Sequence, residues 1–200
     1  VHGRPVTYKL GSPGKHIVLN SLAVLAAVEA LGADLALAAL ALGDLVPPAG
    51  RGARQSLQAP GGRITLIDES YNGNPASMRA AIENLGRIPV TGRGRRIAVL
   101  GDMLELGPSG PALHEGLTDA VLTNGVDKVF ACGPLMRGLY DGLPSAIRGA
   151  YAAQASGLEP LVLDAIRAGD VVTVKGSLGS RMGPIVKAIV ARFPAAPADE

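Results

Sequence analysis

Residues 68–75 hold the side chains of this sequence that are best suited to chemistry. An apolar run ends in the adjacent acids Asp68 and Glu69, which are followed by Ser-Tyr-Asn-Gly-Asn and then Pro75. Carboxylates at the carboxyl end of a strand can accept hydrogen bonds from ribose hydroxyls. Alternatively, the asparagines satisfy their own turn, with Asn74 as the N-cap and Pro75 in the first turn of a helix. That alternative leaves the paired acids unexplained.

Two further apolar runs also end in polar side chains. Residues 101–107 carry Asp102 and Glu105, and His114 follows one helical segment later. Residues 175–177 place a lysine and a serine where a strand is expected to meet a helix. A cation beside a hydroxyl at such a junction suits a carboxylate ligand. Each stretch is equally compatible with ordinary turn chemistry.

Three polar residues lie nearer the N-terminus. His16 and Asn20 are four residues apart, so they share one face near the start of an expected helix, where anionic or polar ligand groups bind well. The same pair can instead be a cap or a buried hydrogen-bonded pair. Arg51 follows a Pro-Pro-Ala-Gly loop. An arginine there can make several contacts with a phosphate, or can form a salt bridge between domains.

Alternating strands and helices are expected to position these side chains. Apolar runs rich in β-branched residues predict strands at 64–67, 97–100, 128–131 and 171–174, and helical patterns predict helices at 75–87, 112–123, 158–167 and 182–192. This alternation indicates an α/β fold, a Rossmann-like, mostly parallel sheet with helices on both faces. Ligands bind such sheets at the carboxyl ends of the strands, which is where the polar stretches lie.

The first 50 residues follow another pattern. We expect a short strand at 6–10, a helix at 16–31 that ends at Gly32, and a helix at 34–42 with Asp34 as its N-cap. A change in composition near residues 50–60 predicts domains at 1–52 and 53–194, with a frayed tail at 195–200. Charged residues interrupt the apolar stretch 17–46. A transmembrane helix is therefore not expected.

Composition and missing motifs exclude several classes of protein. The chain is 48% hydrophobic with no Trp, which predicts an aliphatic core, and its net charge of +2 does not suggest a nucleic-acid partner. The single cysteine, Cys132, excludes an internal disulfide and is expected to be a buried thiol in a reducing compartment. Phosphate-loop, dinucleotide, zinc and nucleophile-elbow motifs are absent. No metal site and no complete catalytic constellation is predicted, and an NAD-type oxidoreductase is disfavoured.

Taken together, the polar stretches resemble the C-terminal part of the Mur ligases. The resemblance rests on Gly14-Lys15-His16 with Asn20, Gly50-Arg51, Asp68-Glu69-Ser70-Tyr71-Asn72-Gly73-Asn74-Pro75, Gly101-Asp102-Met103-Leu104-Glu105-Leu106-Gly107 with His114, and Lys175-Gly176-Ser177 with Met182. It covers roughly residues 6–192. One departure is Ile17, where the family often has Asn. Another is Gly73, often Ala in relatives, which we expect to change only local rigidity.

The resemblance implies a domain plan and an activity. Residues 1–52 would be a mainly helical remnant of a central ATPase domain, and 53–194 the whole Rossmann-like last domain of a longer protein. ATP would phosphorylate the terminal carboxylate of UDP-N-acetylmuramoyl-tripeptide, and the amine of D-Ala-D-Ala would attack the acyl phosphate to form an amide in peptidoglycan synthesis. Mg²⁺ ligands and catalytic residues would lie outside this chain. The fragment would be inactive alone, and the enzyme would be a cytoplasmic monomer that needs no nucleic acid or membrane insertion.

The family pattern also implies roles for individual residues. It assigns ATP binding to His16, Asn20, Arg51, Asp68, Glu69, Asn72 and Asn74, with either Asp68 or Glu69 at the ribose. It assigns binding of D-Ala-D-Ala to Lys175, Gly176, Ser177 and His114. The main alternative is a non-catalytic Rossmann-like module that binds a nucleotide or a small acid, or that serves as a docking surface.

Overall fold

The computed structural model describes residues 5–11, 15–46 and 49–196, without the side chains of Lys15 and His16. The chain divides into two compact units, residues 1–48 and 49–200. No helix of the described residues is long and apolar enough to cross a membrane.

The first unit is a helical hairpin. Helix α1 spans Lys15–Ala30, α2 spans Leu35–Ala41, and the 3₁₀ turn η1 spans Leu42–Asp44. The prediction of two helices is confirmed, and Asp34 caps α2 by accepting hydrogen bonds from the amides of Ala36 and Leu37 at 2.8 and 3.0 Å. The strand expected at 6–10 is wrong. That segment meets helices rather than a second strand, and the Tyr8 hydroxyl lies 2.7 Å from Ser21 Oγ of α1.

The second unit is built on a six-stranded sheet in the order β1-β2-β6-β3-β4-β5. Its strands are β1 Ala53–Ala59, β2 Gly62–Glu69, β3 Arg96–Gly101, β4 Lys128–Cys132, β5 Arg148–Ala152 and β6 Val171–Lys175. All neighbours are parallel except β1 and β2, which form an antiparallel hairpin. The predicted α/β class and all four predicted strands are confirmed. Strands β1 and β5 were not predicted, because they are edge strands without a continuous apolar run.

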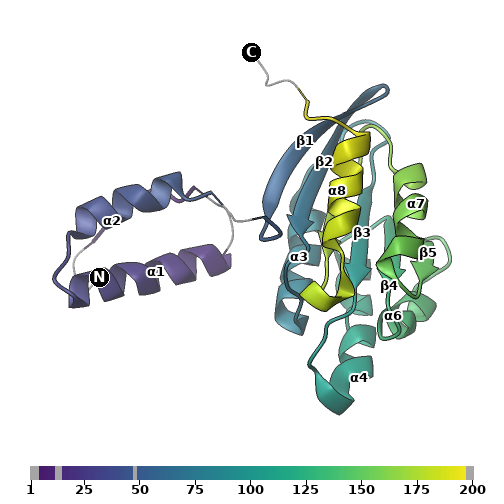
Figure 1. The fold of residues 1–200 in the computed structure, drawn as a ribbon, viewed down its shortest axis with the longest axis horizontal. Coiled ribbons are helices and arrows are strands. Elements are labelled where there is room, and N and C mark those ends of the chain that lie inside the picture. The colour runs from purple at the N-terminus through teal and green to yellow at the C-terminus, as the bar shows by residue number, and fades with distance from the viewer. Residues whose placement is uncertain (1–4, 12–14, 47–48, 197–200) are drawn as a thin grey trace. The chain divides into compact units, whose positions relative to one another are not determined.

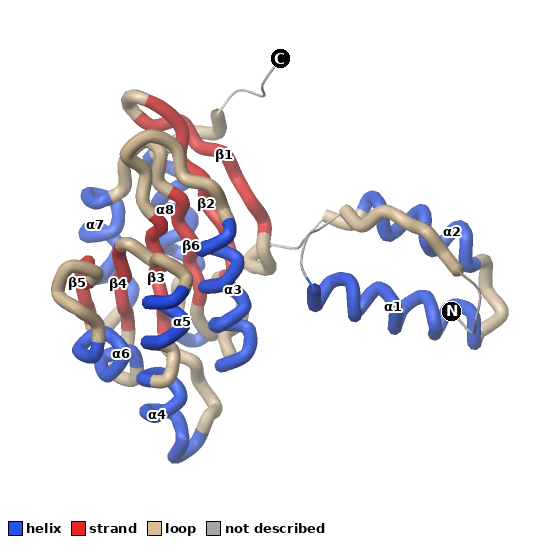
Figure 2. Tube along the Cα trace, turned by 180° about the vertical axis from the view of Figure 1, so that it is seen from behind, coloured by secondary structure: helices blue, strands red, loops and turns tan. Residues whose placement is uncertain are grey.

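Helices cover both faces of this sheet (Figures 1 and 2). One face carries α3 Pro75–Arg87, α5 Thr118–Thr123 and α6 Met136–Gly142, and the other carries α7 Ala155–Ala165 and α8 Gly183–Arg192. Helix α4, Gly110–Glu115, and the 3₁₀ turns η2, Gly107–Ser109, and η3, Leu178–Ser180, belong to connections. The single helix expected at 112–123 is wrong, because the helix is interrupted at Gly116 and a second helix begins at Thr118. The Gly116 carbonyl accepts a 2.6 Å hydrogen bond from Arg79 Nη2. Helix α6 was missed.

The core consists of two aliphatic layers, one on each face of the sheet. Strand β6 is buried along its whole length and supplies residues to both layers, with Val172 and Val174 in one and Val171 in the other. Burying each such side chain contributes roughly 1.5–3 kcal/mol. This central strand is therefore a rigid base for the loop that follows it.

Candidate functional site

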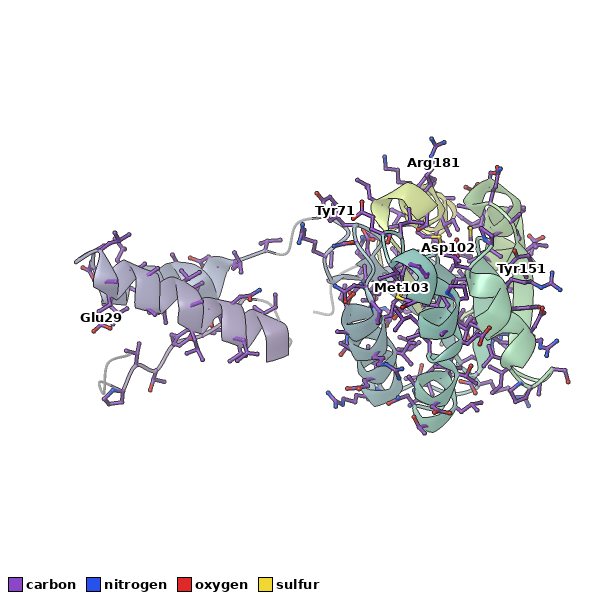
Figure 3. The ribbon with its side chains drawn as sticks, turned by 90° about the horizontal axis from the view of Figure 1, so that it is seen from below. Glu29, Tyr71, Asp102, Met103, Tyr151 and Arg181 are labelled. Atoms are coloured by element: carbon purple, nitrogen blue, oxygen red, sulfur yellow. The ribbon has the colours of Figure 1, made fainter. Side chains whose placement is uncertain are left out.

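Three loops meet at the carboxyl ends of β2, β6 and β3, which are neighbours in the sheet. They are residues 70–74, 176–181 and 102–106, and we call this region the carboxyl edge. Figure 3 looks onto it, with Tyr71, Asp102, Met103 and Arg181 labelled. The three strands run parallel, so their ends fall on one side of the sheet. The prediction that these polar stretches lie at the carboxyl ends of strands is confirmed.

Ser177 ties the three loops together. Its buried hydroxyl donates to the Gly73 carbonyl at 3.1 Å and accepts from the Leu104 amide at 2.9 Å. Its own amide donates to the Asp102 carbonyl at 3.0 Å. Ser177 thus links the loop after β6 to the loop after β2 on one side and to the loop after β3 on the other.

Two glycines let these loops approach closely. A Cβ on Gly73 would lie 3.0 Å from both the Gly176 carbonyl carbon and the Ser177 nitrogen, and a Cβ on Gly176 would lie 3.1 Å from the Gly101 Cα at the end of β3. This close approach adds a steric constraint at Gly73 to the change in local rigidity that we expect there. A side chain at this position would require the loop after β6 to shift by a few tenths of an ångström.

Lys175 and Glu69 form an ion pair beneath the loops. The Lys175 ammonium lies 3.1 Å from Glu69 Oε2 and donates to the Asn72 carbonyl at 2.8 Å. The lysine side chain is 4% exposed and the glutamate side chain 20%. Glu69 Oε1 makes no hydrogen bond with the described residues and faces the Gly52 side of the loop. A buried pair of this kind is costly to break, because the remaining charge would lose its partner.

Asp68, by contrast, has its carboxylate fully engaged. Its two oxygens accept from the Gly50 amide at 2.9 Å, the Ser70 amide at 3.1 Å and the Ser70 hydroxyl at 2.6 Å. Asp68 is buried, and these bonds pin the end of β2 to the chain that leads into β1. The two adjacent acids therefore have different surroundings.

The two asparagines also bond within their own turn. Asn72 Oδ1 accepts from the Gly73 amide at 2.8 Å. Asn74 caps α3 through a reciprocal capping box with Ser77, and Pro75 is in the first turn of that helix. The turn interpretation of Asn74 and Pro75 is confirmed, so the first turn of α3 is firmly placed.

Arg51 stacks on Tyr71, with its guanidinium carbon 4.3 Å from the ring centroid. Both residues are exposed, and among the described residues the guanidinium has no hydrogen-bond partner. An exposed cation–π contact contributes only about 0.5–1 kcal/mol. The guanidinium edge consequently stays open to an anion.

His114 and Asp102 shape the loop after β3. His114 is fully buried, its Nε2 accepts from the Met103 amide at 2.9 Å, and its Nδ1 lies 2.7 Å from the Gly110 carbonyl. This pattern requires the neutral tautomer with the proton on Nδ1. Asp102, also buried, accepts from the amides of Leu135 and Met136 at 3.3 and 2.8 Å, where α6 begins.

No separate role was predicted for Asp102. The signal that could have found it is an acid directly after the Gly that ends an apolar strand. An acid in that position can reach the amides at the start of a neighbouring helix.

The second unit thus holds Arg51, Asp68, Glu69, Asn72, Asn74, His114, Lys175, Gly176 and Ser177. Asn20 lies in the first unit, exposed on α1, which does not support a buried pair for it. The prediction for the His16 side chain falls outside the described residues. Within the described ranges, no group of three His, Cys, Asp or Glu residues is placed to hold a metal ion.

Comparison with known proteins identifies the class. The sequence profile of the Mur ligase glutamate ligase domain matches residues 53–178, more than half of the chain. The chain therefore belongs to the Mur ligase family, and its mostly parallel sheet gathers its polar loops at one edge.

Within this family, the chain is similar to ligases of one kind. The chain is 31% identical to a UDP-N-acetylmuramoyl-tripeptide–D-alanyl-D-alanine ligase of Rickettsia prowazekii, over 86% of this chain and 37% of that protein. It is 32% identical to the Escherichia coli ligase of the same name, over 88% and 37%. A crystal structure of MurF from Acinetobacter baumannii superposes with a TM-score of 0.77 at 26% identity, covering 92% of this chain and 40% of that one. This chain spans 37–41% of the length of its curated relatives.

Proposed function

We propose that this chain is part of an ATP-dependent amide ligase that joins D-Ala-D-Ala to UDP-N-acetylmuramoyl-tripeptide. The observation that carries the proposal is the carboxyl edge itself. There, the Ser177 bonds and the Lys175–Glu69 pair fix three ligand-facing loops against one another. The names of the related ligases supply the two substrates, and the proposed place of the reaction is peptidoglycan synthesis. The reaction proposed for the whole protein runs through an acyl phosphate.

Glu69, rather than Asp68, is our candidate for the ATP ribose. Asp68 already accepts three hydrogen bonds within the chain, so a ribose hydroxyl would have to displace one. Glu69 has one oxygen held by Lys175 and the other without a partner among the described residues. An oriented carboxylate with a spare oxygen can accept a hydrogen bond from a ribose hydroxyl at little reorganisation cost.

Arg51 is our candidate for the ATP phosphates, because its guanidinium is exposed and, among the described residues, is held in place only by Tyr71. Asn72 and Asn74 would support the pocket by fixing the turn beneath it. His16 and Asn20 remain candidates for the adenine. The part of the chain described here offers neither a metal site nor a phosphate-binding loop. Mg²⁺, which members of the family use, would be held by residues outside it.

The four residues proposed for D-Ala-D-Ala fall into two groups. Lys175 and Ser177 are buried and occupied, so we propose that they and Gly176 set the position of the loop that the dipeptide contacts. His114 has both ring nitrogens bonded within the chain and no exposed surface. It would act on the dipeptide only by holding the Met103 amide in place, as a positioning residue.

Phosphate release by the full-length protein tests the proposed reaction. Release should require both UDP-N-acetylmuramoyl-tripeptide and D-Ala-D-Ala, and turnover without the dipeptide would contradict the proposal. The 200-residue chain alone should release no phosphate. Calorimetry with ATP tests the alternative, because a self-sufficient nucleotide-binding module would bind ATP tightly without the rest of the protein.

A matched pair of variants tests the ribose assignment. In the full-length protein, Glu69→Gln should raise the KM for ATP about tenfold, equivalent to about 1.4 kcal/mol of lost binding. The control Glu83→Gln changes an exposed acid of α3 that lies 3.7 Å from Arg87 and should leave the KM unchanged. Equal KM values for the two variants would refute the assignment to Glu69.

A further inference from the structure

The C-terminal segment does not fray where it leaves α8. The Gln58 amide of β1 donates to the Pro194 carbonyl at 2.7 Å, and the Ala196 amide donates to the Ser56 carbonyl at 2.8 Å. These bonds form an antiparallel bridge between Leu57 and Ala195. The expectation of a frayed tail is therefore wrong for residues 195–196, and residues 197–200 lie outside the described part. We call residues 194–196 the strap.

The strap lies on the outer edge of the sheet. Strand β1 is the first in the sheet order, and β2 pairs with its inner side. The outward side of an edge strand presents amide and carbonyl groups that can pair with another chain. Here the strap satisfies the outward amide of Gln58 and the outward carbonyl of Ser56.

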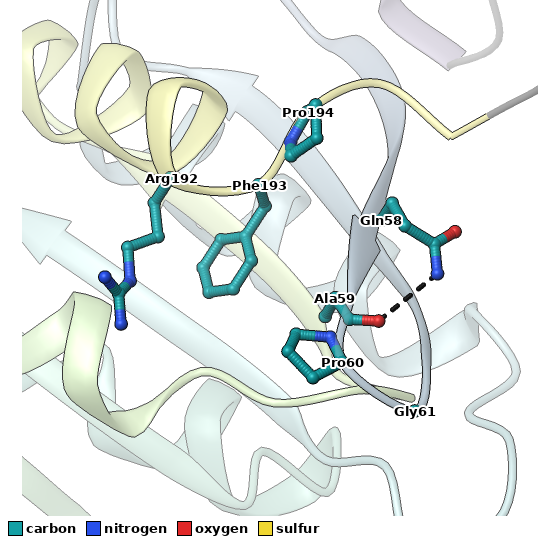
Figure 4. Close-up of a pocket in the computed structure, with 7 residues that line it drawn as sticks. All are labelled: Gln58, Ala59, Pro60, Gly61, Arg192, Phe193 and Pro194. Atoms are coloured by element: carbon teal, nitrogen blue, oxygen red, sulfur yellow. Dashed lines mark hydrogen bonds between the residues drawn. The ribbon is translucent and has the colours of Figure 1, made fainter.

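An anchor next to the strap holds it in place. Phe193 is 7% exposed and belongs to the core layer that α8 covers. Figure 4 shows its ring between α8 and the tip of the β1–β2 hairpin, in the wall of a pocket of about 470 Å³. Pro194 follows at once, and it cannot donate a backbone hydrogen bond of its own. The strap therefore bonds only through Pro194 O and Ala196 N at this bridge.

We propose that the strap occupies a site that a second copy of this chain would otherwise take through β1. The two bonds of the strap have the geometry of an antiparallel pair centred on Leu57. If two β1 strands pair about Leu57, each Gln58 amide donates to the Ser56 carbonyl of the other copy. Pro194 O and Ala196 N are thus substitutes for Ser56 O and Gln58 N of a second β1 strand.

The side chains of β1 permit this self-pairing. About Leu57, Ser56 would face Gln58 and Arg54 would face Pro60, so no two like charges would lie opposite each other. Ser56 and Gln58 are exposed, whereas Leu57 and Ala59 point into the core. The two sheets would join into one continuous sheet with two-fold symmetry, the commonest form of homodimer.

Truncation with a matched control tests the proposal. A chain that ends at Phe193 loses the strap, whereas a chain that ends at Ala196 keeps it. In sedimentation equilibrium across a concentration series, the chain ending at Phe193 should approach twice the monomer mass. The intact chain and the chain ending at Ala196 should each keep the mass of a monomer at every concentration. Protection of the Gln58 amide from hydrogen exchange should become concentration-dependent only in the chain that ends at Phe193.

A substitution in β1 tests whether the association uses the outward edge of this strand. Gln58→Pro removes the outward amide of β1 and is compatible with an edge strand. Added to the chain ending at Phe193, it should restore the monomer mass. A folded chain ending at Phe193 that stays monomeric at every concentration would overturn the proposal. So would association that Gln58→Pro does not suppress.

If the chain ending at Phe193 fails to fold, as judged by circular dichroism, Ala196→Pro in the intact chain takes its place. It deletes one of the two strap bonds without shortening the chain. We expect the same concentration-dependent rise in mass, and a monomer at every concentration would again overturn the proposal.

Discussion

Ser177→Ala should loosen the carboxyl edge without disturbing the core. The substitution removes one oxygen, and with it the acceptor of the Leu104 amide and the donor to the Gly73 carbonyl. Ser177 is 6% exposed, so water cannot readily replace these bonds. Each buried polar group left without a partner costs about 1–3 kcal/mol. Because the Leu104 amide is only partly buried, we expect a total loss of about 2–3 kcal/mol.

Urea unfolding measures this loss. With an m-value of about 2 kcal/mol/M, the midpoint should fall by roughly 1 M. The control Ser109→Ala changes an exposed serine at the start of α4 whose side chain makes no capping bond, and its midpoint should stay at the parental value. Hydrogen exchange locates the effect, because the Leu104 amide should lose protection only in Ser177→Ala. Equal midpoints for the two variants, or a Leu104 amide that stays protected, would refute the role given to Ser177.

Three other perturbations probe the frame around the site. Burial and the nearby Asp102 raise the pKa of Cys132 from 9.0 to about 11. Iodoacetamide labelling of Cys132 at pH 8 should therefore be about a hundredfold slower in the folded chain than in urea. The free energy of unfolding should fall as the pH rises from about 9 to about 11, because the thiol of the unfolded chain ionises first. Gly133→Ala should lower the thermal midpoint far more than Gly125→Ala. Both glycines have positive φ, but only at Gly133 would a Cβ lie 2.4 Å from the Asp102 carboxylate. Asp102→Ala should cost about 2–3 kcal/mol in urea unfolding by freeing the amides at the start of α6, whereas the exposed Asp164→Ala should cost almost nothing.

The central part of the fold was predictable because its signals are local. The four predicted strands are buried on both faces, and so they appear as continuous apolar runs. The edges were not predictable in this way. Strand β1 has the sequence ARQSLQA, in which the solvent-exposed side chains are polar. It forms a strand because β2 and the strap pair with its backbone. Residues 6–10 show the reverse case. Their alternating apolar pattern predicts a strand, but among the described residues no strand lies beside them to pair with, so they do not form one.

The candidate site shows the same division between position and role. Parallel topology alone predicts that the loops after β2, β3 and β6 meet, because strand ends share one side of the sheet. The role of each residue depends on contacts between distant parts of the sequence, such as Lys175 with Glu69, or Ser177 with Gly73. The sequence gives no measure of these contacts. The adjacent acids Asp68 and Glu69 could therefore be separated only when their partners were known.

Most of the polar groups at the carboxyl edge hold the edge together. Asp68, Asn74, Asp102, His114 and Ser177 all bond to backbone groups of neighbouring loops or helix ends. Among the described residues, Glu69 Oε1 and the guanidinium of Arg51 are two groups that keep unused hydrogen-bonding capacity. A ligand that meets this edge would thus add contacts to a frame that is already fixed. Binding energy then goes into orienting the ligand rather than ordering the loops, which is the condition that favours transfer between two bound substrates.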